Sequence, residues 1–187
     1  ALVSVDLIGL PYPMVQRIRG ELDDFAYVMV SATHNHEGPD TIGIWGRTIF
    51  TTGVNPDYTK QLIQRIVRCV RDAESKLTPA VADYGTAEDE SLLGDSRLPK
   101  VRDGVLRLLR FRHAQTDQLL GLLVQWNCHP EALGSRNTLI TADFPAAMVA
   151  LLRAKFNVPV AYFTGAVGGL MAPPDGVIRN AGGALLE

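Results

Sequence analysis

Two histidines stand one residue apart in residues 30–40, VSATHNHEGPD, directly after an apolar run. On an extended segment, side chains at positions i and i+2 point the same way, so His34 and His36 can both face one cavity. Imidazole is a good zinc ligand, and a catalytic zinc site uses about three protein ligands and keeps one position open. His129 follows another apolar run and is the candidate for a third. The pattern indicates a metal site, with ordinary loop histidines as the alternative.

Carboxylates near these histidines can serve the same chemistry. Each can supply a ligand, orient an imidazole from behind, or act as a general base. Structural roles compete with these, since Asp143 is also expected to cap a helix and Asp40 to close the turn at Gly38. The carboxylates in question are Glu37, Asp40, Glu131 and Asp143.

Other chemistries have weaker support in the sequence. No serine stands in a G-x-S-x-G elbow, which argues against a serine nucleophile. The glycine-rich stretch GAVGGLMAPP, residues 165–174, lacks the G-x-G-x-x-G spacing and is followed by prolines, so we expect a loop lining a cavity rather than a dinucleotide site. Cys128 is adjacent to His129 and points to the opposite face of a strand, so it is predicted to be a buried thiol, as is Cys69 in a helix.

The first elements that position the histidines are a strand, a helix and a second strand. Residues 2–10 and 25–32 are apolar runs of strand character, and residues 11–24 carry apolar side chains at helical spacing. Such a sequence predicts a parallel crossover. A longer helix is predicted to follow, with Asn55 as its N-cap and Pro56 at its first position.

The second half of the chain predicts more strands than helices. Residues 79–88 are a strand, residues 89–104 a polar loop, and residues 104–126 a β-hairpin that turns at residues 114–118. A helix over residues 141–156, capped by Thr141 or Asp143, leads to a buried strand over residues 157–166. The predicted fold class is α/β, with a mixed, largely parallel sheet flanked by helices and one β-hairpin.

Three polar or glycine-rich segments follow the carboxyl ends of apolar strands: residues 34–40, 127–137 and 165–174. In open α/β sheets, ligands bind outside the carboxyl ends of the strands. If these strands are parallel, the three segments share one rim. The two halves of the proposed metal site would then meet there.

Composition excludes several classes of protein. The 187 residues carry 18 basic and 20 acidic side chains and a net charge of -2, which gives no electrostatic support for nucleic-acid binding. No apolar run is long enough for a transmembrane segment. The chain opens inside a strand pattern and stops without a terminal cap, so we interpret residues 1–187 as part of a single domain truncated at both ends. The oligomeric state stays open.

The ordered motifs SATHNHEGPD, WNCHPEALGSRNTLITADFPAAM and YFTGAVGGLMAPP resemble the amino-terminal catalytic domain of the neutral/alkaline non-lysosomal ceramidase family, and the opening VSVDLIGLP fits that domain too. The resemblance implies a zinc-dependent amidase of sphingolipid metabolism. Such enzymes cleave the N-acyl bond of ceramide through a metal-activated water and release sphingosine and a fatty acid. Relatives are often secreted or periplasmic, and the implied partner is a small-molecule or lipid amide substrate.

The resemblance also implies roles for particular residues. His34 and His129 match zinc (Zn²⁺) ligands, and His36 matches the histidine that assists the reaction beside the metal. The family's other ligands, a glutamate and a tyrosine, belong to a later part of the domain. The chain departs from the family in the substrate loop formed by Gly168, Gly169 and Met171, because ceramidases carry a GDxSP loop where this chain has GGLMAP. The acylated substrate can therefore differ from ceramide, and a non-lipid amide or ester stays open.

Two rival interpretations remain. An amidohydrolase-type barrel also begins its metal site with an HxH pair after a strand, but the hairpin before His129 does not fit its regular alternation of strands and helices. The other rival is a non-catalytic, ceramidase-like domain that binds a lipid or a sugar.

Overall fold

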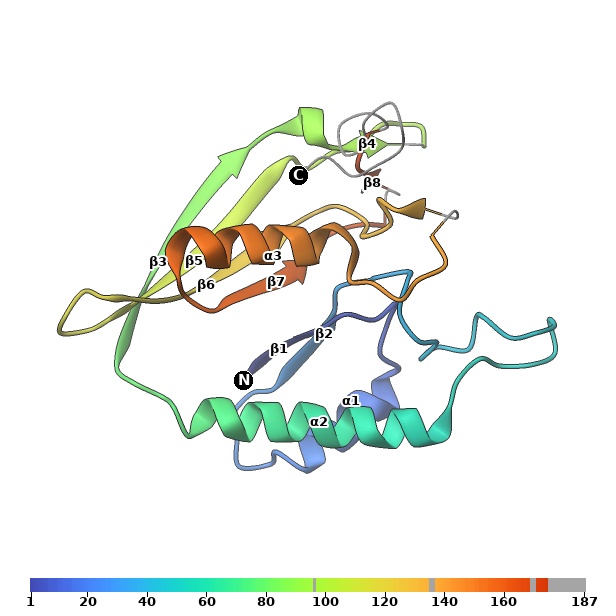
Figure 1. Ribbon diagram of the computed structural model, residues 1–187, viewed down its shortest axis with the longest axis horizontal. Helices are drawn as coiled ribbons and strands as arrows, with labels where there is room; N and C mark the ends of the chain where they lie inside the picture. Colours follow the sequence, from blue (N-terminus) through green and yellow to red (C-terminus); the bar gives the residue numbers. More distant parts are fainter. Residues whose placement is uncertain (96, 135–136, 169–170, 175–187) are drawn as a thin grey trace.

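Two parallel strands and the helix between them form the first unit of the fold (Figure 1). The computed structural model describes residues 1–95, 97–134, 137–168 and 171–174. Strand β1 (Leu2–Val5) pairs in parallel with β2 (Met29–Ala32), and α1 (Tyr12–Gly20) connects them. This confirms the predicted crossover.

Strand β1 is shorter than predicted because the chain turns directly after it. The Leu7 N–H donates to the Val5 carbonyl at 2.9 Å, which ends the extended conformation. Leu7 and Ile8 are nevertheless buried, at 2% and 4% exposure. Their apolar character reflects a buried loop rather than a continued strand.

Helix α2 (Pro56–Glu74) lies on one side of β1 and β2, and β7 lies on their other side (Figure 1). The predicted cap is confirmed, since the Asn55 side chain accepts from the Tyr58 N–H at 3.0 Å. The helix buries one stripe against α1 and the first two strands, and this core consists of Val3, Leu7, Met14, Ile18, Leu22, Val28, Leu62, Ile66 and Val70. Cys69 is exposed, so its predicted burial was wrong. It lies beside the stripe rather than in it.

A mixed four-stranded sheet forms the second unit. Its strands are β3 (Ala80–Glu88), β5 (Val105–His113), β6 (Leu119–Trp126) and β7 (Val160–Thr164), in the order β3-β5-β6-β7. The first two pairs are antiparallel and β6 pairs with β7 in parallel. Helix α3 (Asp143–Phe156) connects β6 to β7 and lies against the sheet (Figure 1). The predicted α/β class, the mixed sheet and the hairpin are confirmed. The sheet is not largely parallel as predicted, because two of its three strand pairs are antiparallel.

The segment between β3 and β5 is more ordered than the predicted polar loop. It contains a 3-10 turn, η1 (Glu90–Leu92), and strand β4 (Gly94–Asp95), which pairs with β8 (Met171–Ala172). Leu93 is 1% exposed and belongs to a second core cluster with Trp126, Cys128 and Tyr162. Pairs of such short strands have no periodicity that a sequence can reveal.

The two units meet along β1, β2 and β7. The Ser4 hydroxyl donates to the Tyr162 carbonyl, and the Thr164 hydroxyl donates to the Thr33 carbonyl. Thr164 also pairs with Trp126 at the end of β6. The carboxyl ends of β2, β6 and β7 therefore lie at one edge, as the predicted rim requires. Among the described residues, no helix is long and apolar enough to cross a membrane.

Candidate metal centre

The structure brings three of the four histidines together at this edge. The ligand atoms of His34, His36 and His129 all lie within 4.8 Å of one another, and the group could hold a metal ion. The ring centroid of His34 lies 4.9 Å from that of His36 and 4.9 Å from that of His129, and the centroids of His36 and His129 are 5.8 Å apart. The predicted meeting of the loops after β2 and β6 is confirmed.

His34 has an unusual backbone and a fixed ring. Its φ of 66° lies in the left-handed region, which costs a residue with a side chain about 1–3 kcal/mol. Hydrogen bonds on both sides hold it there, from the Thr33 N–H to the Val5 carbonyl and from the Asn35 N–H to the Leu7 carbonyl. His34 and His36 thus come together through a turn. The predicted approach of the two side chains is confirmed, but the extended segment from which it was predicted is not present.

The His34 ring nitrogen Nδ1 lies 2.8 Å from the Ile8 carbonyl oxygen. A carbonyl can only accept, so Nδ1 carries the proton and the lone pair of the neutral ring is on Nε2. Metal-binding histidines typically make such a bond with the nitrogen that does not bind the metal. The ring is therefore oriented as a ligand would be.

His36 belongs to the cluster and also faces a carboxylate. Its Nδ1 is 3.4 Å from the Glu131 carboxylate, while its Nε2 is buried and has no hydrogen-bond partner among the described residues. Burial lowers the pKa of His36 below its ordinary value, and the Glu131 charge opposes this shift. The neutral ring can thus hold its proton toward Glu131 and keep the Nε2 lone pair for a second partner.

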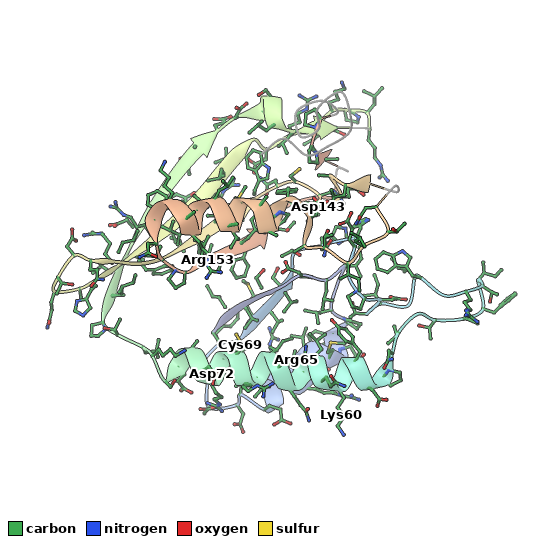
Figure 2. The ribbon with its side chains drawn as sticks, in the orientation of Figure 1. Lys60, Arg65, Cys69, Asp72, Asp143 and Arg153 are labelled. Carbon is green, nitrogen blue, oxygen red and sulfur yellow. The ribbon has the colours of Figure 1, made fainter. Side chains whose placement is uncertain are left out.

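His129 is 4% exposed and lies in a loop that Asp143 holds. The Asp143 carboxylate accepts from the N–H groups of Ala132 at 3.0 Å and Leu133 at 2.9 Å. Figure 2 shows Asp143 at the start of α3, where its own φ is 52°. The N-cap position of α3 is Ala142, not Thr141 or Asp143 as predicted. The predicted side chains still accept from the first turn, since Thr141 accepts from the Asp143 N–H at 3.1 Å and Asp143 accepts from the Phe144 N–H at 2.7 Å. Asp143 also fastens the loop after β6.

Asn35 and Thr141 link the two histidine loops. Sequence reasoning did not name Asn35 and named Thr141 only as a possible helix cap. Asn35 is 1% exposed, and its side-chain amide donates to the Thr141 carbonyl at 2.5 Å. The Thr141 hydroxyl donates to the Glu37 carboxylate, so Glu37 has a structural partner. The position of Asn35 between the two histidines was the only sequence signal.

In the glycine loop, Gly165 leaves room for the ends of two neighbouring side chains. A Cβ on Gly165 would lie 1.7 Å from the Gln125 amide nitrogen and 2.0 Å from the Asn127 side-chain oxygen. That oxygen accepts from the Ala166 N–H at 2.9 Å, which joins this loop to the segment before His129.

The predicted substrate loop is only partly described. A Cβ on Gly168 would meet nothing within 4 Å. The backbone of Met171 pairs with Asp95 in the β4–β8 ladder. Gly169 and the side chain of Met171 lie outside the described residues. The role of these three residues stays a prediction.

A hollow of about 530 Å³ opens beside His36. Glu131 lines it together with apolar side chains from two loops, Trp45 before α2 and Leu139 and Ile140 before α3. Cys128, next to His129, is buried, and burial raises the pKa of its thiol to about 12. The predicted inert thiol is confirmed. The polar residues that line the hollow are His36, Glu37, Glu131, Asn137 and Thr138.

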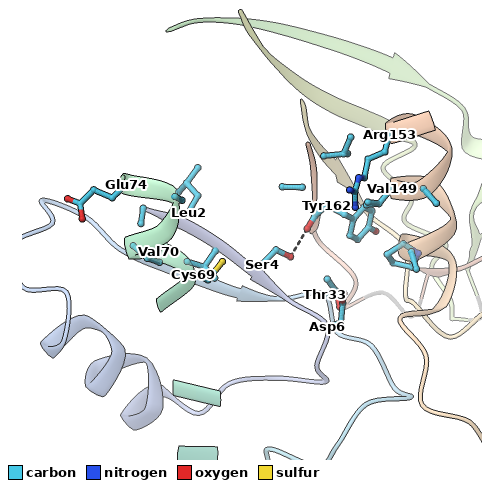
Figure 3. A pocket seen from close by; sticks show the side chains of 18 of the residues that line it. Leu2, Ser4, Asp6, Thr33, Cys69, Val70, Glu74, Val149, Arg153 and Tyr162 are labelled. Atoms are coloured by element: carbon cyan, nitrogen blue, oxygen red, sulfur yellow. Dashed lines mark hydrogen bonds between the residues drawn. The ribbon is translucent and has the colours of Figure 1, made fainter. Parts of the chain in front are cut away.

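A larger cavity of about 690 Å³ lies between α2 and α3 (Figure 3). Cys69 and Val70 face it from α2, and Arg153 faces it from α3. Its lining is mostly apolar and includes none of the three clustered histidines. The smaller hollow is therefore the one that adjoins the candidate metal centre.

Comparison with known proteins identifies the fold. No protein-family model and no curated protein sequence matches the chain. The neutral ceramidase from Pseudomonas aeruginosa matches in structure with a TM-score of 0.80 at 18% identity, over 97% of this chain and 32% of that one. A ceramidase complexed with C2 matches with a TM-score of 0.75 at 19% identity, over 92% and 30%.

This chain spans about a third of the length of either neighbour. At such low identity the likeness concerns the fold. It agrees with the resemblance seen in the sequence motifs and excludes the amidohydrolase-type barrel, whose strands do not form the order β3-β5-β6-β7 with antiparallel pairs. The chain has the fold of one part of the neutral ceramidases.

Proposed function

We propose that this chain is part of a zinc-dependent hydrolase that cleaves the N-acyl amide bond of a ceramide-like or other acylated substrate. The observation that supports this most is the cluster of His34, His36 and His129 at the strand ends of a ceramidase-like fold. The solved neighbours are named as ceramidases, and amide hydrolysis at a metal is the chemistry that such a cluster suits.

The residues present fit a zinc ion. Imidazole nitrogens are typical zinc donors. The bond from His34 Nδ1 to the Ile8 carbonyl leaves the Nε2 lone pair for a metal, and His36 Nε2 is buried with no partner in the described part of the chain. We assign His34 and His129 as ligands. Bound zinc would supply a Lewis acid that polarises the acyl carbonyl and makes a water more acidic.

His36 is assigned to proton transfer. Its Nδ1 faces Glu131, so the carboxylate favours the tautomer with the proton on Nδ1 and stabilises the ring when it takes a second proton on Nε2. The ring can thus accept a proton from the attacking water and return one to the leaving amine. The cluster geometry also suits His36 as a third ligand, and a metal analysis of its alanine variant separates these roles.

The hollow beside His36 is assigned to the acyl part of the substrate. Trp45, Leu139 and Ile140 give it an apolar wall. Its polar part consists of His36, Glu37, Glu131, Asn137 and Thr138. An apolar wall with a few converging polar groups is the usual composition of a small-molecule site.

A panel of substrates tests the proposal in the complete protein. N-acyl sphingoid bases, N-acyl amino acids and O-acyl esters of equal chain length are compared for fatty-acid release. The proposal expects faster release from the amides. Release from the esters alone would point to an esterase. Binding of the same lipids without any release would point to the non-catalytic binding domain.

A further inference from the structure

Within the segment between β2 and α2, residues 41–54 form a loop that extends away from the rest of the described structure (Figure 1, cyan). It carries large apolar side chains that the described structure leaves in solvent. Ile49 is 92% exposed and Phe50 is 90% exposed, more than any other large apolar residue described, and Ile44 is 58% exposed. Isolated exposed apolar residues are common, but several on one projecting loop indicate a surface that meets a partner.

The apolar pair occupies the apex of a tight turn. The Thr51 N–H donates to the Thr48 carbonyl at 3.1 Å, and the Thr48 N–H donates to the Thr51 hydroxyl at 2.9 Å. Ile49 and Phe50 are the two central residues of that turn. Such positions usually hold Gly, Pro, Asn, Asp or Ser, so two bulky apolar residues there need an explanation other than turn formation.

The base of the loop is held firmly by Asp40, which is 7% exposed. Its carboxylate accepts from backbone N–H groups on both sides of the loop, those of Ile42, Gly43, Ile44, Trp45 and Gly53. A Cβ on Gly53 would lie 2.4 Å from the Trp45 carbonyl oxygen, so the two sides touch there. The loop therefore presents its tip from a fixed base.

The charges of the loop favour a lipid surface as the partner. From Thr41 to Pro56 the only charged side chain is Arg47, and no acidic residue is present. A cation next to apolar residues suits an interface in which the apolar groups enter the acyl region and the cation meets anionic headgroups.

The loop also leads to the candidate site. Trp45, near its base, lines the hollow beside His36, and so do Leu139 and Ile140, which are 72% and 79% exposed. Apolar surface thus extends from the loop toward the mouth of that hollow. The proposed docking loop therefore also contributes to the wall of the hollow.

We propose that residues 41–54 form a lipid-docking loop, in which Ile49 and Phe50 insert into a lipid surface and Arg47 contacts anionic headgroups. The loop would hold the hollow beside His36 against lipids that contain an acyl amide. This last step rests on the proposed function, whereas the docking itself does not.

Cosedimentation of the complete protein with vesicles tests the docking. Vesicles of phosphatidylcholine alone and of phosphatidylcholine with phosphatidylserine are compared, without any substrate. Ile49→Ser and Phe50→Ser should each weaken binding by about tenfold or more, because each removes an apolar side chain that the lipid would bury. Arg47→Gln should weaken binding about fivefold, and only to vesicles with phosphatidylserine. Leu98→Ser is the matched control, since Leu98 is 86% exposed outside the loop.

Three outcomes would overturn the proposal: no vesicle binding by the complete protein, unchanged binding by the Ile49→Ser/Phe50→Ser variant, or slow hydrogen exchange at residues 48–51 without vesicles. The last would show that the rest of the protein covers the loop. Circular dichroism checks that the variants fold. Hydrolysis of a water-soluble short-chain amide should be unchanged in them. Vesicle binding by a protein with no hydrolase activity would refute the proposed function and leave the docking intact.

Discussion

The Nδ1 atom of His34 lies 2.8 Å from the carbonyl oxygen of Ile8, in the loop that follows β1. This bond selects the tautomer of the ring and orients it from a segment distant in the sequence. The turn after β1, which shortens that strand, is what places the carbonyl there. The same local structure thus explains a strand that ends early and the orientation of a histidine in the candidate metal centre.

His34→Ala and His129→Ala are expected to lose the metal. Loss of a residue that only orients a ligand costs 10- to 100-fold in metal affinity, so loss of a ligand should cost more than about 100-fold. Zinc content and competition with a chelator measure this in the complete protein. His113→Ala is the control, because the His113 ring accepts hydrogen bonds from backbone N–H groups in the hairpin turn. This variant should retain all of the metal. Equal zinc content in all three variants would refute the ligand assignment.

His36→Ala is expected to keep the metal and lose turnover. General acid-base catalysis contributes roughly 10²- to 10⁴-fold in rate, so kcat should fall by that factor. Zinc analysis of the same preparation is essential. If the zinc were lost as in the His34→Ala variant, His36 would be a third ligand, and its assignment to proton transfer would be wrong.

Glu131 is expected to act through His36. Its carboxylate lies 3.4 Å from His36 Nδ1, and removal of such an orienting partner typically costs about 10- to 100-fold. Glu131→Ala should therefore lower kcat with little change in KM or zinc content, and Glu131→Asp should restore part of the loss. The Glu131 side chain is 37% exposed, so the melting temperature should hardly change. Full activity of Glu131→Ala would contradict this role.

Asp143→Ala is expected to destabilise the fold. The substitution leaves the N–H groups of Ala132, Leu133 and Phe144 without their acceptor, and each unsatisfied buried donor costs about 1–3 kcal/mol. Partial access of water to the loop makes a total loss of about 2–4 kcal/mol the expected result. Urea unfolding measures this value. A loss below about 0.5 kcal/mol, within the range of neutral surface substitutions, would show that Asp143 does not hold the His129 loop.

Local signals predicted much of the fold. The cap at Asn55 and the apolar stripe through Leu62, Ile66 and Val70 predicted α2, and the hairpin followed from two runs around a polar turn. The β4–β8 pair was missed because each strand has two residues and the pairing is distant in sequence.

The residues that cluster at the candidate site could be predicted from the sequence, but the contacts that bring them together could not. The histidines at strand ends predicted the cluster, since strand ends of a parallel arrangement converge. The left-handed backbone at His34, and the bond from Asn35 to Thr141, depend on contacts between distant segments. The bonds from Ala132 and Leu133 to Asp143 were missed because these partners lie in another loop.

Zinc analysis of the complete protein, combined with chelation, tests the central claim most directly. We predict about one zinc per chain, loss of fatty-acid release from an N-acyl substrate when a chelator removes it, and recovery when zinc is returned. A protein that is purified without metal and hydrolyses the same substrate unchanged in the presence of chelator would contradict the account.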